Sequence, residues 1–113
     1  IKNLTIKQIH RGRHTVSSSL VHGVVSGRGA VSFKALIKIE PPAAHADAQQ
    51  TSKHLLLCPT ARAVAVPAIE VLNDQVRCKH GSAMSQLDPA LIFYLQSRGL
   101  AADKAIALIT RYF

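Results

Sequence analysis

A cysteine and a histidine separated by one residue are the strongest candidates for chemistry in this sequence of 113 residues. They lie in the segment VRCKHG, as Cys78 and His80. In an extended strand, residues i and i+2 point to the same side, so the thiol and the imidazole would be presented together. Thiolate and imidazole are good ligands for iron or zinc, and the positive charge of Lys79 should favour the thiolate.

Two ligands do not complete the coordination of a metal ion, so the remaining ligands must come from a partner or a small molecule. The alternative is a buried thiol beside a polar turn closed by Gly81.

The other potentially reactive residues form no recognisable catalytic constellation. The sequence contains no GxSxG, P-loop or HExxH motif. The second cysteine, Cys58, has no zinc-finger spacing to Cys78, and nothing suggests a secreted chain, so we expect reduced thiols in a cytoplasmic-type compartment. Isolated histidines are usually surface residues or hydrogen-bonded core residues. We therefore expect no chemistry from the other five, which are His10, His14, His22, His45 and His54.

The elements that must position the cysteine and the histidine are predicted to be short strands. Residues 31–39 alternate apolar and polar side chains, as a half-buried strand does. The apolar run 55–58 is typical of a strand covered on both faces. Pro67 cannot donate to a sheet ladder, so residues 61–71 are predicted to form two short strands around a corner. Residues 43–50 are small and polar, and we expect a loop there.

A weak internal repeat indicates how these strands are arranged. Residues 20–39 align without gaps on residues 52–71 at an offset of 32, which places His22 on His54. Short strands that repeat at a fixed period predict a parallel solenoid, in which each coil buries its apolar side on its neighbour. A sandwich or a small barrel is the alternative. We expect parallel strands over residues 1–77.

The last part of the chain is predicted to be helical. Asp88 and Pro89 are a typical N-cap and first helical residue, and Gly99 is a typical stop, so one helix is expected over residues 89–98. A second helix is predicted over residues 102–113, where apolar residues recur with the helical period.

The composition narrows the class of protein. Hydrophobic residues make up 48% of the chain, which excludes intrinsic disorder, and no apolar run approaches the ~20 residues of a membrane span. The net charge is +8, and residues 1–39 contain seven basic residues and no acidic one. A basic half can bind nucleic acid, anionic lipid or an acidic protein, or it can be a solvated surface.

Several motifs in the second half resemble the SufB/SufD family, the scaffold proteins of the SUF iron–sulfur cluster assembly system. The likeness consists of PAIEV at residues 67–71, the Cys78–Gly81 segment, and FYLQSRGL at residues 93–100. The Cys-x-His-Gly pattern is closer to SufD than to SufB, although Lys79 replaces the usual small residue. The resemblance implies a right-handed parallel β-helix followed by a pair of α-helices. We expect residues 1–87 to be a β-helix segment truncated at its N-terminal side, and residues 88–113 to be a truncated helical region.

The resemblance also implies a function. It predicts a non-catalytic scaffold subunit in the cytoplasm that pairs with a SufB-like paralogue and docks a SufC-type ATPase. Cys78 and His80 would be ligands for iron or a cluster at the subunit interface. The chain alone would form a homodimer and hold no stable cofactor, whereas the full complex would hold a transient iron or iron–sulfur cluster. The partner-binding residues implied by the resemblance are Phe93, Tyr94, Leu95, Arg98, Tyr112 and Phe113.

Two other interpretations of the same sequence remain open. The first is a basic, β-rich nucleic-acid-binding module, which would bind phosphates in a salt-dependent way. Against it, residues 1–39 contain a single aromatic residue, Phe33, whereas single-strand platforms usually have several. The second is a structural solenoid without metal chemistry.

Overall fold

The computed structural model describes all residues 1–113 as six strands followed by two helices. The strands are β1 (Lys2–His10), β2 (Val16–Val25), β3 (Ala30–Ile39), β4 (Asp47–Leu56), β5 (Arg62–Val71) and β6 (Arg77–Gln86). The helices are α1 (Pro89–Ser97) and α2 (Ala102–Arg111), within one or two residues of the predicted ends. Neither helix combines the length and the apolar character needed to span a bilayer.

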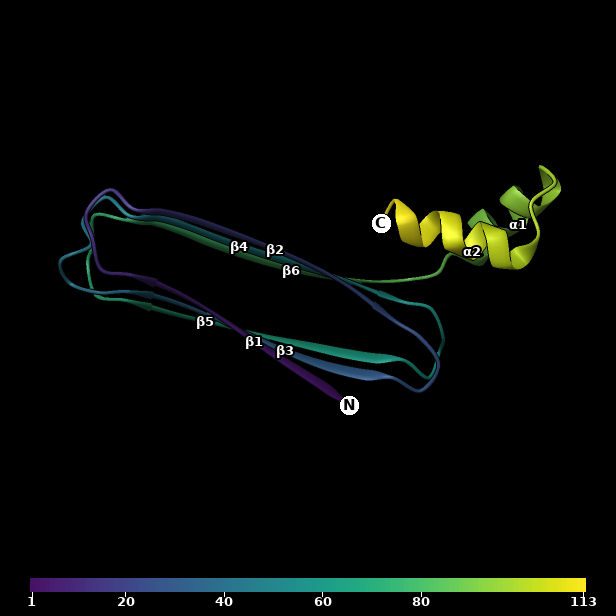
Figure 1. The fold of residues 1–113 in the computed structure, drawn as a ribbon, viewed down its shortest axis with the longest axis horizontal. Coiled ribbons are helices and arrows are strands. Elements are labelled where there is room, and N and C mark those ends of the chain that lie inside the picture. The colour runs from purple at the N-terminus through teal and green to yellow at the C-terminus, as the bar shows by residue number, and fades with distance from the viewer.

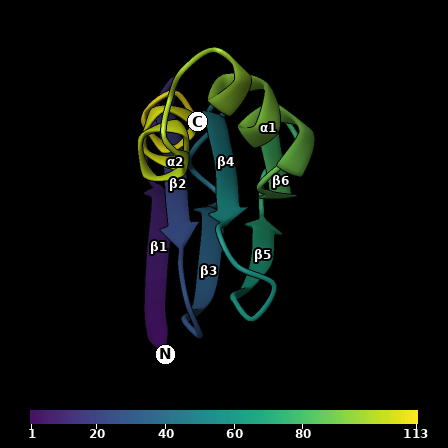
Figure 2. The ribbon, with the colours of Figure 1, turned by 90° about the vertical axis from the view of Figure 1, so that its right-hand side faces the viewer.

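The chain alternates between two parallel sheets. The odd strands form one sheet in the order β1-β3-β5, and the even strands form the other in the order β2-β4-β6. Figure 1 shows the sheets as two long layers with both helices at one end, and Figure 2 looks along the molecule from that end. The molecule is 57 Å long and 15 Å across its shortest axis. All four strand pairs are parallel, which confirms the predicted strand direction.

Backbone hydrogen bonds continue from the strands into the turns. The amide of His14 donates to the carbonyl of Ala44 at 2.9 Å, and the amide of His45 donates to the carbonyl of Gln75 at 2.6 Å. At the other end, the amide of Leu57 donates to the carbonyl of Val25 at 2.8 Å. Each turn therefore lies against the equivalent turn of the next repeat and is hydrogen-bonded to it.

The register agrees with the predicted repeat between β3 and β5 and differs from it by one residue between β2 and β4. Between β3 and β5, Ala30 pairs with Arg62, which is the predicted offset of 32. Between β2 and β4, Gly23 lies opposite His54, where the ungapped alignment had placed His22. A side chain at Gly23 would have its Cβ only 2.6 Å from the His54 ring. Glycine at this position therefore makes room for the imidazole.

Two predictions about the strands were wrong, and a third was correct only in part. β5 runs without a break through Pro67, because β5 is an edge strand and a proline at an edge costs no ladder hydrogen bond on its open side. The expected loop 43–50 becomes strand from Asp47 onward. Gln50 is buried in that strand, so a polar sequence here does not mean an exposed loop. The apolar run 55–58 is strand only as far as Leu56.

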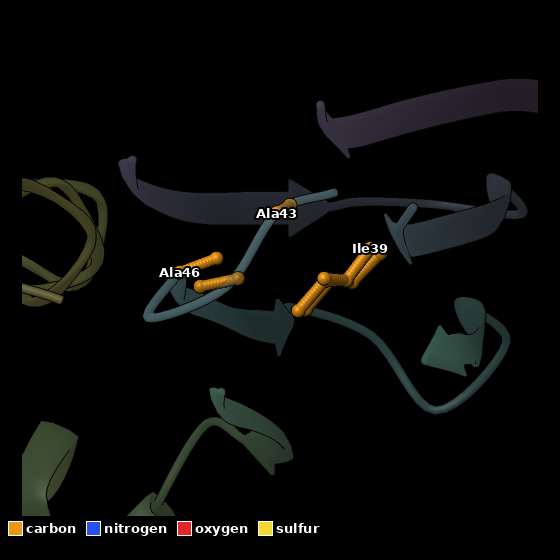
Figure 3. Close-up of a cluster of buried hydrophobic side chains, with 5 residues drawn as sticks. Ile39, Ala43 and Ala46 are labelled. Atoms are coloured by element: carbon orange, nitrogen blue, oxygen red, sulfur yellow. The ribbon is translucent and has the colours of Figure 1, made fainter. Parts of the chain in front are cut away.

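The core lies between the two sheets and is small. Only 15 of the 113 residues are buried, so each large buried side chain carries a substantial share of the packing. One apolar cluster gathers side chains of β3, β4 and the turn between them, and Figure 3 labels Ile39, Ala43 and Ala46 within it. Toward the other end of β3, Phe33 is 1% exposed and packs at a tilt against the ring of His54, with centroids 6.0 Å apart.

Both helices begin at the residues that the sequence indicated and end one or two residues earlier than predicted. The Asp88 side chain accepts a hydrogen bond from the amide of Ala90 at 2.9 Å, which caps α1. Gly99 follows α1 with a φ of +97°, a conformation that favours glycine. The N-cap of α2, Ala101, makes no such side-chain hydrogen bond. The start of α2 thus lacks the capping interaction that α1 has.

Candidate functional site

Cys78 and His80 lie on β6, an edge strand of its sheet. Their register partners on β4 are Ala48 and Gln50, which are both buried. The alternation of a strand thus places both residues on the face of β6 that is turned toward the interior between the sheets. Beyond β6 the sheet has no further strand. The face that carries Cys78 and His80 therefore continues the inner face of β4 out to the open edge of the sheet.

The surroundings of the two side chains differ. Cys78 is half-buried and packs against the apolar cluster around Ile39, whereas His80 is exposed. Burial raises the pKa of the Cys78 thiol above its ordinary value. The expectation that positive surroundings favour the thiolate is therefore wrong for this chain by itself, because desolvation outweighs the charge of the exposed Lys79. A metal ion that binds the sulfur would reverse this preference.

The chain supplies only part of a metal coordination shell at this place. No three side chains of the types His, Cys, Asp or Glu converge on one point anywhere in the structure. Cys78 and His80 can thus provide two ligands at most, and a tetrahedral iron or zinc centre needs two more. Because β6 is at the rim, the missing ligands have open access from outside the chain.

The interior next to β6 is polar, which sequence reasoning missed. Gln50, Ser52 and His54 alternate along β4 and are all buried. On the neighbouring repeat, the buried His10 ring lies 2.7 Å from Thr15 Oγ1 and 2.6 Å from Ser17 Oγ, so both of its nitrogens have partners. The signal was the period-two spacing of residues 50, 52 and 54, but polar residues at that spacing usually indicate an exposed face.

His54 makes the stability of the fold dependent on pH. It is 1% exposed, its Nδ1 atom has no hydrogen-bond partner, and burial lowers its pKa below the ordinary value. The unfolded chain therefore binds a proton more readily than the folded chain. We expect the free energy of unfolding to fall as the pH drops through about 6.5, the ordinary pKa of histidine, and to keep falling toward the folded-state pKa.

Thermal melts between pH 8 and pH 5 measure this effect. His54→Gln, which cannot be protonated in this range, should show a shallower loss of melting temperature than the natural chain. Equal slopes for the two proteins would contradict the assignment to His54.

A second cluster lies at the turns that precede β2, β4 and β6. The rings of His14 and His45 are stacked, with centroids 4.9 Å apart and planes 12° apart, and both residues have a positive φ. They border a cavity of about 660 Å³ that is also lined by Asp47, Asp74 and Arg77. The cavity lies beside the start of β6, but its histidines belong to the turns and not to the inner face that holds Cys78.

The remaining cysteine lies apart from this site. Cys58 follows β4 in the turn at the opposite end of the strand from Ala48, and its sulfur accepts a hydrogen bond from the amide of Gly27 at 3.3 Å. Both thiols are free.

The residues predicted to bind partners lie on or after the two helices. Phe93 and Tyr112 are 72% and 75% exposed. Tyr94 is also exposed, and the guanidinium of Arg98 lies over its ring, 5.3 Å from the centroid. By contrast, Leu95 is half-buried, and so is Phe113, whose ring packs at 5.4 Å from that of His22. The helical region thus offers exposed aromatic side chains, while Leu95 and Phe113 are partly used within the chain.

Comparison with known proteins identifies relatives along the whole chain. The family model for the SufBD core domain of the SUF system for FeS cluster assembly matches residues 1–113. The chain is 33% identical over 108 residues to the iron–sulfur cluster assembly protein SufD of Bacillus subtilis (strain 168), covering 96% of the chain and 25% of that protein. It is 34% identical over 97 residues to SufD of Escherichia coli (strain K12), covering 86% of the chain and 23% of that protein.

A third relative carries the more general family name. The SufBD family protein ycf24 of Antithamnion sp. is 33% identical over 107 residues, covering 95% of the chain and 36% of that protein. The chain therefore spans between about a quarter and a third of the length of these curated relatives.

Proposed function

The chain belongs to the SufBD core family of the SUF iron–sulfur cluster assembly system, and on this premise we propose that it acts as a SufD-like scaffold segment in cluster assembly. The observation that carries the proposal is the position of Cys78 and His80 on the same face of an edge strand. Two cluster ligands at the rim suit a site that a second subunit completes. In this role the chain is a scaffold and not an enzyme, and iron or a nascent cluster is its cargo.

The architecture supports a matching proposal for the fold. Two parallel sheets with alternating strands and hydrogen-bonded turns are what a segment of a right-handed parallel β-helix contains. Such a segment exposes unpaired backbone groups along its last strands, here β5 and β6. We propose that a SufB-like paralogue covers this edge in the complex, and that a second copy of the chain covers it when the chain is alone.

The helical region is the proposed docking element for a SufC-type ATPase. Its exposed aromatic side chains, Phe93 and Tyr112, have the large apolar area that interface hot spots need. The two helices lie at one end of the sheets, whereas the strand edge runs along their length. One subunit could then hold the paralogue at its edge and the ATPase at its helices without the two competing. The proposed setting is a reducing, cytoplasmic-type compartment.

Co-purification tests the proposed function. When the full-length protein is co-expressed with a SufB-like protein and a SufC-type ATPase, we expect all three to elute together, and light scattering of the chain alone should give the mass of a dimer. Phe93→Ala should weaken retention of the ATPase by about 10-fold or more, the loss typical of an interface hot spot, while retention of the SufB-like protein stays unchanged.

Lys104→Ala is the matched control, because Lys104 is an exposed residue of α2 outside the predicted docking set. A full-length protein that retains neither partner would contradict the scaffold function. Retention of the ATPase by Phe93→Ala at the natural level would contradict only the docking assignment.

A further inference from the structure

A buried glutamine beside the two candidate ligands has an unpaired hydrogen-bond donor. The Gln50 side chain is 3% exposed, and its Nε2 atom has no hydrogen-bond partner. An N–H group that has lost water and gained no partner destabilises the folded state. A leucine would fill a similar space without that cost. A buried amide of this kind is therefore available to an acceptor that binds during function.

Oε1 of Gln8 and Nδ1 of His54 are also buried without a partner, but other polar groups of the interior are engaged on the side away from β6. Nε2 of Gln8 donates to Ser17 Oγ at 2.7 Å, and the same hydroxyl lies 2.6 Å from Nε2 of His10. These contacts join β1 to β2, which lies on the far side of β4 from β6. None of them involves the Gln50 amide.

The register places Gln50 next to both candidate ligands. Gln50 is the direct partner of His80, and the preceding inward residue of β4, Ala48, is the direct partner of Cys78. Neighbouring strands lie about 4.8 Å apart, and a long side chain can reach the diagonal neighbour two positions away. The Gln50 amide is thus within reach of Cys78 Sγ.

We propose that Gln50 is a positioning residue of this site, whose Nε2 amide donates a hydrogen bond to the Cys78 sulfur when that sulfur is a metal-bound thiolate. The inference rests on the proposed role of Cys78 and His80 as ligands. A metal-bound thiolate is anionic and has lone pairs free to accept N–H groups. Hydrogen bonds of this kind hold the ligand in place and tune the metal, and their loss typically weakens metal binding by about 10–100-fold.

Cobalt(II) is a suitable probe, since its complexes with thiolates have a sulfur-to-cobalt charge-transfer absorption. The anaerobically purified complex of the full-length protein with its SufB-like partner is titrated with Co²⁺, and the full-length protein carries the natural sequence, Gln50→Leu, Ser52→Ala or Cys78→Ala. We expect Gln50→Leu to bind Co²⁺ about 10-fold more weakly and to shift the charge-transfer band to lower energy, because the thiolate lone pairs lose their donor. The same substitution should raise the melting temperature, because the unpaired amide is gone.

Ser52→Ala is the matched control, since Ser52 is the next inward residue of β4 and is equally buried. It should keep the affinity within about twofold and leave the band in place. Gln50→Met, a second apolar residue of similar length, repeats the test if the leucine variant fails to fold.

The outcomes separate this inference from the proposed function. If the natural complex shows the band, Cys78→Ala abolishes it, and Gln50→Leu binds with unchanged affinity and band energy, the role of Gln50 is wrong and the ligand assignment stands. If the complex with Cys78→Ala keeps the band, or the natural complex never develops it, Cys78 is not a ligand, and both proposals fail at that step.

Discussion

Replacing Phe33 with alanine should lower the free energy of unfolding by about 3–5 kcal/mol. Phe33 is 1% exposed on the central strand β3, and its ring contacts His54 on the other sheet. Truncation would remove the largest fully buried side chain and open a cavity between the sheets. Because a small domain is stable by only about 5–15 kcal/mol, the variant should be close to unfolding at room temperature.

Chemical denaturation with urea, followed by circular dichroism, measures this effect. The matched control is Phe93→Ala, the same substitution at a residue that is 72% exposed, where the change should stay within about 0.5 kcal/mol. Similar losses for the two variants would mean that the interior between the sheets does not determine the stability of the chain.

The sequence predicted the elements that obey a simple period or have a local signal. β3 alternates apolar and polar residues because one of its faces packs into the interior. α1 begins at the Asp88 cap and ends before Gly99, and both signals depend only on nearby backbone. The offset of 32 was recoverable because the apolar residues of β3 and β5 lie side by side in the sheet.

The features that were missed depend on position in the sheets. Pro67 indicates a break in the strand when only the sequence is considered, but an edge strand such as β5 can contain a proline. The polar residues around Gln50 are typical of a loop, and their burial becomes evident only when β4 is packed against the second sheet. In the same way, the period of two placed Cys78 and His80 on one face, but the burial of one and the exposure of the other follow from the cluster at Ile39 and the open rim. Sequence therefore predicted the shared face of the two candidate ligands but not the polar interior behind them.

The second large effect is expected in the loading of the complex with iron and sulfide. Cys78→Ala and His80→Ala should each reduce the iron and sulfide content of the anaerobically purified complex by at least about 10-fold. Even the loss of a group that only supports a metal ligand costs about 10–100-fold in affinity, and these substitutions remove the proposed ligands themselves. Because the chain offers no third ligand nearby, no neighbouring side chain can take their place.

The structure also explains why such a loss would not reflect unfolding. His80 is exposed, and Cys78 is only half-buried at the margin of the apolar cluster, so both alanine variants should keep the parallel sheets intact. Cys58→Ala removes an equally half-buried thiol at the opposite end of β4, and His45→Ala removes an exposed imidazole from the turn cluster. Both controls should load normally. If all four variants carry the same iron and sulfide as the natural complex, Cys78 and His80 are not ligands. Family membership would then stand without this site, and the cluster would have to be held by residues outside this chain.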